Sequence, residues 1–174
     1  YFGTTDAQFE TVIYAFSGAT GAPVWPQAVR FGPPEIEAER TERFIQSLAV
    51  GPCGDLYAVG QYETSIVVGD ETFTNAHASD GADLQLFMVK LGREDGAVRW
   101  STGYSHAGTE LSFSLAAGPG GLLALTGEAF DASGSPGIDF GGGPLPPNGD
   151  NPSASDAYVA TFVDGDTGPT FLFA

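Results

Sequence analysis

Apolar and polar residues alternate along this chain in short runs, and turn residues rich in glycine and proline separate the runs. Alternation with a period of two predicts β-strands. The predicted strands cover residues 44–50, 55–62, 84–91 and 97–104, with a less regular strand over 66–73. In the run 84–91 one face carries Leu84, Leu86 and Met88, and the other carries Phe87, Val89 and Leu91. Few stretches favour a helix, so the pattern predicts an all-β protein.

The pattern also recurs. An alternating run, a turn ending in glycine and an aromatic strand occur over residues 12–25, 87–100 and 158–173. A second phrase occurs over 47–60 and again, 67 residues later, over 114–127. The repeated positions include the turn glycines Gly21, Gly96 and Gly168 and the aromatics Trp25, Trp100 and Phe171. One unit is about 70 residues long, and recurrence on this scale is typical of repeat architectures.

Four or five antiparallel strands in each of several tandem units predict the blades of a β-propeller, and a β-sandwich is the second choice. The expected fold is all-β, a partial β-propeller of about two and a half blades of four-stranded antiparallel sheet. The predicted parts are a half blade (1–32), a charged linker (33–45), a blade (46–108) and a blade (109–174) that contains a long Gly/Pro-rich loop (132–155). Because a ring needs at least ~4 blades, we expect further blades of the same polypeptide, or other chains, to complete it.

Composition narrows the possible partners. The 174 residues include 6 basic and 22 acidic side chains, which gives a net charge of −16 and a pI near 4.1. Nucleic acids and anionic membranes attract positive charge, so neither is an expected partner. The acidic surface leaves two alternatives open, divalent-cation binding and a plain solvated surface. No apolar run reaches the ~18 residues of a membrane helix, and the one cysteine, Cys53, excludes an internal disulfide framework.

Two families resemble this pattern. Residues 139–145 (DFGGGPL), 155–162 (SDAYVATF) and 47–60 resemble the bacterial β-propeller repeats of the SBBP type. That resemblance implies a secreted or cell-envelope protein. Residues 19–25 (ATGAPVW) are also similar to the blade signature of quinoprotein propellers, in which the tryptophan docks between adjacent blades. No residues here match the calcium-and-quinone site of the quinoprotein enzymes.

Candidate chemistry is sparse. Asp164 and Asp166 in one turn, and Asp80 and Asp83 in another, are candidate calcium ligands, because Ca²⁺ prefers clustered carboxylates. The alternative is that these aspartates nucleate turns through hydrogen bonds to the backbone. His77 and His106 stand alone, without a metal-binding spacing, and are expected to be solvated loop residues.

No catalytic group is predicted. Cys53 corresponds to Gly120 in the next unit, so its thiol is not part of the repeated design. Most aromatic residues are expected in the core between blades, and Tyr62, Tyr104 and Phe130 are the candidates for a ligand-facing role. We therefore expect a noncatalytic scaffold or interaction segment that binds no cofactor, with Ca²⁺ as the possible exception. The alternatives are a fragment of a quinoprotein-like propeller enzyme and a calcium-stabilised adhesin.

Overall fold

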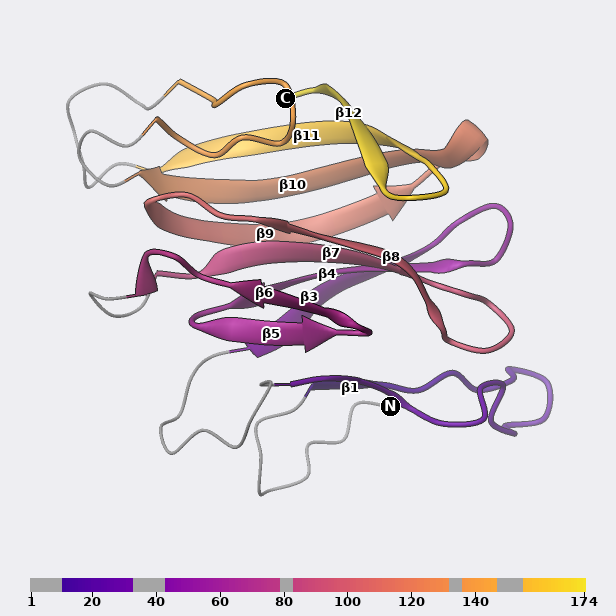
Figure 1. Ribbon diagram of the computed structural model, residues 1–174. Coiled ribbons are helices and arrows are strands. Elements are labelled where there is room, and N and C mark those ends of the chain that lie inside the picture. The colour runs from indigo at the N-terminus through magenta and orange to yellow at the C-terminus, as the bar shows by residue number, and fades with distance from the viewer. Residues whose placement is uncertain (1–10, 33–42, 79–82, 132–135, 147–154) are drawn as a thin grey trace.

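A computed structural model describes residues 11–32, 43–78, 83–131, 136–146 and 155–174 (Figure 1). Two four-stranded antiparallel sheets form its body, as the alternating pattern predicts. The first sheet has the order β3 (Arg43–Val50), β4 (Leu56–Tyr62), β7 (Gln85–Leu91) and β8 (Val98–Tyr104). The second sheet consists of β9 (Gly108–Ala117), β10 (Leu122–Asp131), β11 (Asp156–Asp164) and β12 (Pro169–Phe173), also in chain order. The all-β prediction is confirmed. The described residues do not close a ring of sheets.

Smaller elements accompany the two sheets. A pair of short strands, β1 (Thr11–Ile13) and β2 (Val29–Phe31), is the described part of the predicted half blade. A hairpin of β5 (Ser65–Val68) and β6 (Glu71–Thr74) connects β4 to β7, and a single 3-10 turn, η2 (Pro119–Gly121), connects β9 to β10. In the second sheet, the described part of the predicted Gly/Pro-rich loop forms a small hairpin closed by a bridge between Asp139 and Pro144. Strand β3 begins at Arg43, two residues before the predicted end of the charged linker, and residues 33–42 lie outside the described part.

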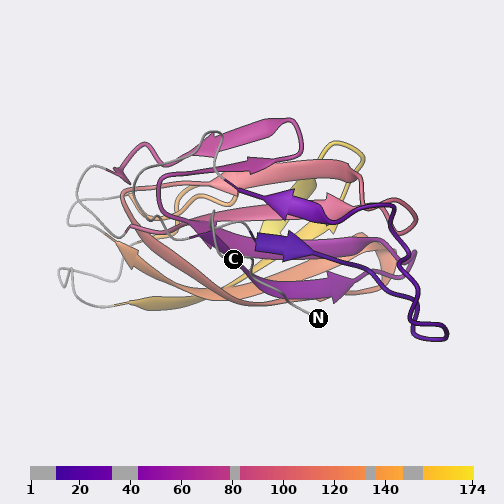
Figure 2. The same cartoon turned by 90° about the horizontal axis from the view of Figure 1, so that it is seen from below.

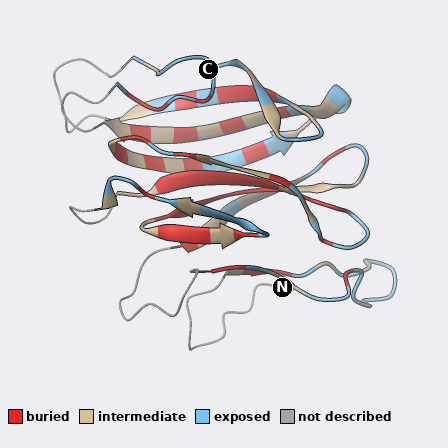
Figure 3. Cartoon of the chain, viewed as in Figure 1, coloured by how far each residue is buried: buried red, intermediate tan, exposed pale blue. Residues whose placement is uncertain are grey.

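The first sheet is covered on both faces. Figures 1 and 2 show the β1–β2 pair on one side of it and the second sheet on the other. On β7, Leu86 and Met88 pack against the second sheet, and Phe87 packs toward the β1–β2 pair. All three side chains are fully buried, and β7 is almost continuously red in Figure 3. The predicted division of this strand into two apolar faces is therefore confirmed, except that Leu84 precedes the strand.

The two sheets are built on the same plan. In the first, Gly60 lies directly opposite Phe87, and in the second Gly127 lies directly opposite Tyr158. A Cβ at Gly60 would lie 2.7 Å from the Phe87 ring, and a Cβ at Gly127 would collide with the Tyr158 ring. Glycine is needed at both places because the missing Cβ would clash with this aromatic side chain and with a backbone carbonyl of the strand on the other side, that of Phe44 or of Leu111. The repeat thus preserves a packing solution, and the two glycines identify equivalent strands.

The innermost strands of the two sheets meet. Strand β9 packs along β3 and β4, where the backbone N–H of Leu115 donates to Ser47 Oγ at 3.0 Å. Gln61 on β4 reaches across to the carbonyl of Ser112 at 3.5 Å. Between these polar contacts lies an apolar core made of residues from both sheets. This core comprises Tyr57, Val59, Leu86, Met88, Trp100 and Tyr104 from the first sheet, Leu115, Leu123, Leu125, Ala129, Tyr158, Ala160 and Phe162 from the second, and Ile138 and Phe140 from the small hairpin.

Candidate functional site

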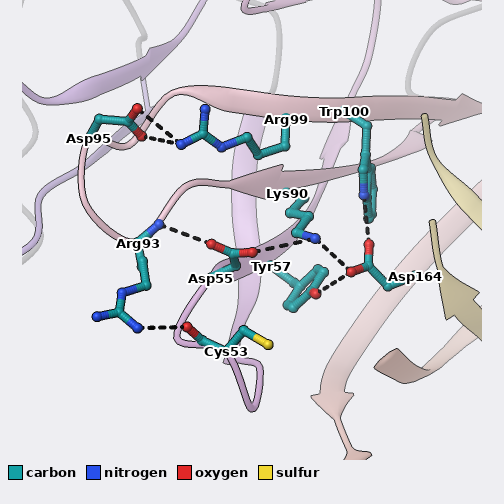
Figure 4. A network of polar contacts seen from close by, with 9 residues as sticks. All are labelled: Cys53, Asp55, Tyr57, Lys90, Arg93, Asp95, Arg99, Trp100 and Asp164. Atoms are coloured by element: carbon teal, nitrogen blue, oxygen red, sulfur yellow. Dashed lines mark hydrogen bonds and ion pairs between the residues drawn. The ribbon is translucent and has the colours of Figure 1, made fainter. Parts of the chain in front are cut away.

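A network of polar contacts holds one end of the interface between the two sheets (Figure 4). At its centre is Asp164, at the end of β11. Asp164 Oδ2 accepts hydrogen bonds from Lys90 Nζ at 2.6 Å and from the hydroxyl of Tyr57 at 2.8 Å, and Oδ1 accepts from the indole N–H of Trp100 at 2.8 Å. Lys90 also forms an ion pair with Asp55 at 3.4 Å. We call these five residues the Asp164 cluster.

The contacts within the Asp164 cluster keep Asp164 and Lys90 charged and Tyr57 neutral near pH 7. Burial by itself raises the pKa of Asp164, but the hydrogen bonds from Lys90, Trp100 and Tyr57 outweigh burial and hold this pKa below its usual value. Burial by itself lowers the pKa of Lys90, but the bond to Asp164 and the neighbouring Tyr57 outweigh it and raise the pKa to about 12. Burial and the bond to Asp164 also raise the pKa of Tyr57 to about 12.

No member of the cluster with a shifted pKa titrates near pH 7, where a general acid or base works best. The arrangement instead joins the sheets, because Tyr57, Lys90 and Trp100 belong to the first sheet and Asp164 to the second. The network continues along the turns of the first sheet. The backbone N–H of Arg93 donates to Asp55 Oδ1 at 3.1 Å, and its guanidinium donates to the carbonyl of Cys53 at 3.1 Å.

Trp25 makes a similar contact between the β1–β2 unit and the first sheet. Its indole N–H donates to the carbonyl of Arg93 at 3.1 Å, in the turn between β7 and β8. Its ring lies against Gly96, where a Cβ would be 2.7 Å from the indole. Trp25 in the β1–β2 unit and Trp100 in the first sheet therefore each bind to the last turn of the next unit.

The third aromatic of the series is Phe173 rather than Phe171. In the first sheet Leu91 pairs with Val98 and Lys90 with Trp100, with an irregularity between the two pairs. In the second sheet Phe162 pairs with Phe171 and Thr161 with Phe173, again with an irregularity between them. Phe173 thus holds the place of Trp100, and Phe171 holds that of Val98. The prediction was wrong by two residues because the connection from Phe162 to Phe171 is two residues longer than the connection from Leu91 to Val98.

The three repeated turn glycines all have positive φ. The values are 69° at Gly21, 70° at Gly96 and 148° at Gly168. This is the region that favours glycine, so the prediction that these turns need it is confirmed.

The candidate calcium residues are not assembled into a metal site in the described part of the chain, where no group of three or more potential ligands occurs. Asp164 already binds a lysine ammonium, and Asp166 is exposed in the same turn. The Asp83 carboxylate accepts a bond from Thr109 at 3.3 Å, and Asp80 lies outside the described residues. The calcium assignment stays a prediction.

At the loop between the two sheets the structure shows a buried polar pair that the sequence reasoning missed. The imidazole of His106 contacts the carboxylate of Glu110, and the two residues are 5% and 0% exposed. The backbone N–H of His106 donates to Gln85 Oε1 at 2.9 Å. The prediction of a solvated His106 was therefore wrong, whereas His77 is exposed as expected.

Of the predicted ligand-facing aromatics, Tyr62 is 1% exposed and Tyr104 is 9% exposed, so both belong to the core. Phe130 is half-buried near the end of β10. The core prediction for the other aromatics holds for Trp25, Phe31, Phe87, Trp100, Tyr158 and Phe162, whereas Tyr14, Phe16 and Phe113 are about half exposed. Cys53 is a free, exposed thiol.

No family model matches the chain, and a search of curated proteins finds no match to it either. Among the described residues, no helix is long and apolar enough to cross a membrane.

Proposed function

We propose that this chain is a run of stacked β-propeller blades that serves as a noncatalytic scaffold in a secreted or cell-envelope bacterial protein. The observation that carries the proposal is the burial of the two central strands of the first sheet, β4 and β7, on both faces. A two-layer sandwich leaves the outer face of each sheet to solvent. The first sheet instead lies between two neighbours of related sequence, as a blade does within a propeller.

The way in which the units join supports the same proposal. Each sheet is a four-stranded meander in chain order, and its innermost strand packs against the innermost strand of its neighbour. Trp25 and Trp100 dock onto the next unit in the same direction. Units that join always in one direction generate a curved stack, and further blades of the polypeptide or other chains would complete its ring.

The charged residues support a scaffold better than an enzyme. In the Asp164 cluster, Lys90 and Asp164 neutralise each other across the two sheets, and the resulting pKa shifts move both groups away from neutral pH. A catalytic acid or base is tuned in the opposite direction, toward the working pH. The shifted groups thus hold two blades together.

Electron microscopy of the protein assembled with the rest of its polypeptide or with its partner chains tests the architecture. We expect a ring whose blades surround a central axis, and a compact two-layer domain without an axis would overturn the proposal. A titration with pyrroloquinoline quinone in the presence of Ca²⁺, followed by tryptophan fluorescence, tests the absence of catalysis. We expect no saturable quenching. Saturable binding would favour the quinoprotein-like enzyme in place of the scaffold.

A further inference from the structure

The connection between β8 and β9, which joins the two sheets, is held to the first sheet by buried polar contacts. Gln85, at the start of β7, is fully buried and bonds to the connection twice. Its Oε1 accepts from the backbone N–H of His106, and its Nε2 donates to the carbonyl of Gly108, both at 2.9 Å. The backbone N–H of Glu110 donates to the carbonyl of Leu84 at 2.7 Å. The start of the second sheet is therefore fixed to the start of β7.

A buried imidazole and a buried carboxylate lie within this connection. The imidazole of His106 contacts the carboxylate of Glu110, and both side chains are almost fully buried. No hydrogen bond from the described residues reaches Glu110 Oε2, so the imidazole is the group that compensates the carboxylate. A carboxylate removed from water is costly when nothing compensates its charge. The closed connection consequently retains one proton on the pair, whether that proton stays on the imidazole or moves to the carboxylate.

The carboxylates near the pair favour this protonated state. Asp83 accepts a hydrogen bond from Thr109 at 3.3 Å, directly before Glu110. Ala129 lies opposite Glu110, and Asp156 lies opposite Ala129 on the next strand. Strand β10 ends in another acidic residue, at the position opposite the first residue of β9. Negative charges close to a site stabilise its protonated form, so these groups help the pair to keep its proton.

The other titratable groups packed around the pair keep their charge between pH 6 and pH 8. Burial raises the pKa of Tyr104, at the end of β8, and the pKa of Tyr158 on β11, so both stay neutral. Arg43 on β3 directs its guanidinium to the start of the β5–β6 hairpin, where it donates to the carbonyl of Ser65. A change of charge at the connection in this range therefore belongs to the pair of His106 and Glu110.

We propose that the His106–Glu110 pair is a proton-dependent lock on the connection between the two sheets. When the connection opens, the histidine is exposed to solvent and releases its proton above about pH 6.5. Closing the lock above this pH takes up a proton, so the closed state is stable below about pH 6.5 and loses stability as the pH rises. The inference requires only the contact between the two sheets and does not depend on a closed propeller.

Acid opens the same lock from the other side. Below about pH 4.3 an exposed glutamate binds a proton, whereas a second proton on the closed pair would leave a buried cation. The closed state is thus stable above about pH 4.3 and is lost as the pH falls further. Asp164 loses its stabilisation in the same acidic range, so the alkaline side provides the test.

Hydrogen exchange at single amides measures the opening of the lock. The amides of His106 and Glu110 are bonded to Gln85 and Leu84, so they exchange when the connection opens. After correction for the intrinsic base-catalysed rate, the protection of both amides should fall at least about fivefold between pH 6 and pH 8. Release of one proton from a histidine that titrates near pH 6.5 limits the fall to about 25-fold.

Two variants assign the effect to the pair. Glu110→Gln removes the carboxylate that retains the proton, so the protection of these amides should change by less than about twofold between the two pH values. The matched control is His77→Ala, which removes the exposed histidine and should keep the full fall.

The proposal is overturned if protection in the unaltered protein falls less than about fivefold, if His77→Ala abolishes the fall, or if Glu110→Gln retains it. If Glu110→Gln does not fold, the unaltered protein and His77→Ala still decide the matter, because the chain contains two histidines.

Discussion

Removal of the Asp164 carboxylate tests whether the polar cluster holds the two sheets together. The substitution Asp164→Ala leaves three donors of the first sheet, on Tyr57, Lys90 and Trp100, without their acceptor. Trp100 is only 4% exposed, so water replaces the lost acceptor poorly there. The ammonium of Lys90 retains Asp55 at 3.4 Å, which limits the loss.

The magnitude follows from the number and burial of these bonds. A hydrogen bond to a charged group contributes about 1.5–3 kcal/mol, and such contributions are not additive within one network. The side chains of Lys90 and Asp164 are 16% and 14% exposed, so solvent screens their attraction in part. We expect Asp164→Ala to lower the free energy of unfolding by about 3 kcal/mol, a value near the lower end for breaking a buried pair. For a chain of this size, the melting temperature should fall by roughly 6–12 °C.

Urea denaturation measures this effect directly. Tryptophan fluorescence reports on the interface through Trp100, far-UV circular dichroism reports on the strands, and an unchanged m-value shows that only the stability has changed. The matched control is Asp166→Ala, an exposed aspartate in the same turn, which should change the free energy of unfolding by no more than about 0.5 kcal/mol. A double-mutant cycle with Lys90→Met should give a coupling energy of about 1–2 kcal/mol. If Asp164→Ala is within about 1 kcal/mol of Asp166→Ala, the cluster does not hold the interface.

The other predictions concern acid, metal and packing. Because the pKa of Asp164 is lower in the folded state, its stabilisation is present above the unfolded carboxyl value of about 3.9 and is lost as the pH falls through the folded value. Acid titration of Asp164→Ala should accordingly show a smaller loss of stability below about pH 4 than the unaltered protein, and equal losses would contradict the shift. Differential scanning calorimetry with and without a chelator should give the same melting temperature, since the Asp164 carboxylate already binds Lys90. A lower melting temperature with chelator would support the alternative hypothesis of a calcium-stabilised adhesin. Gly127→Ala should destabilise the second sheet by about 2 kcal/mol or more through a clash with Tyr158, whereas Gly18→Ala, with open space around it, should be nearly neutral in the same urea assay.

Periodicity predicted the strands and the two apolar faces of β7, because alternation depends only on local geometry. The repeat predicted that the chain contains equivalent sheets. The Asp164 cluster could not be predicted in this way, since Trp100 and Tyr57 lie 64 and 107 residues before Asp164 and meet it only after the sheets stack. The burial of His106 was missed for a related reason: a lone histidine in a loop has no local signal of burial, and its partner Gln85 lies 21 residues away.

Alignment of the two sheets by strand register shows where the side chains of their outer faces differ. The pair Tyr57–Lys90, which binds Asp164, corresponds in register to the pair Ala124–Thr161 of the second sheet, and Trp100 corresponds to Phe173. The outer face of the second sheet consequently lacks the ammonium, phenol and indole groups that bind a carboxylate in the first. Its exposed residues there include Val159 at 53% and Phe173 at 62%. A neighbouring unit on this face would therefore contact apolar side chains and no counterpart of the Asp164 cluster. An aspartate placed there as Asp164 is placed on the first sheet would be desolvated without a cation to pair with.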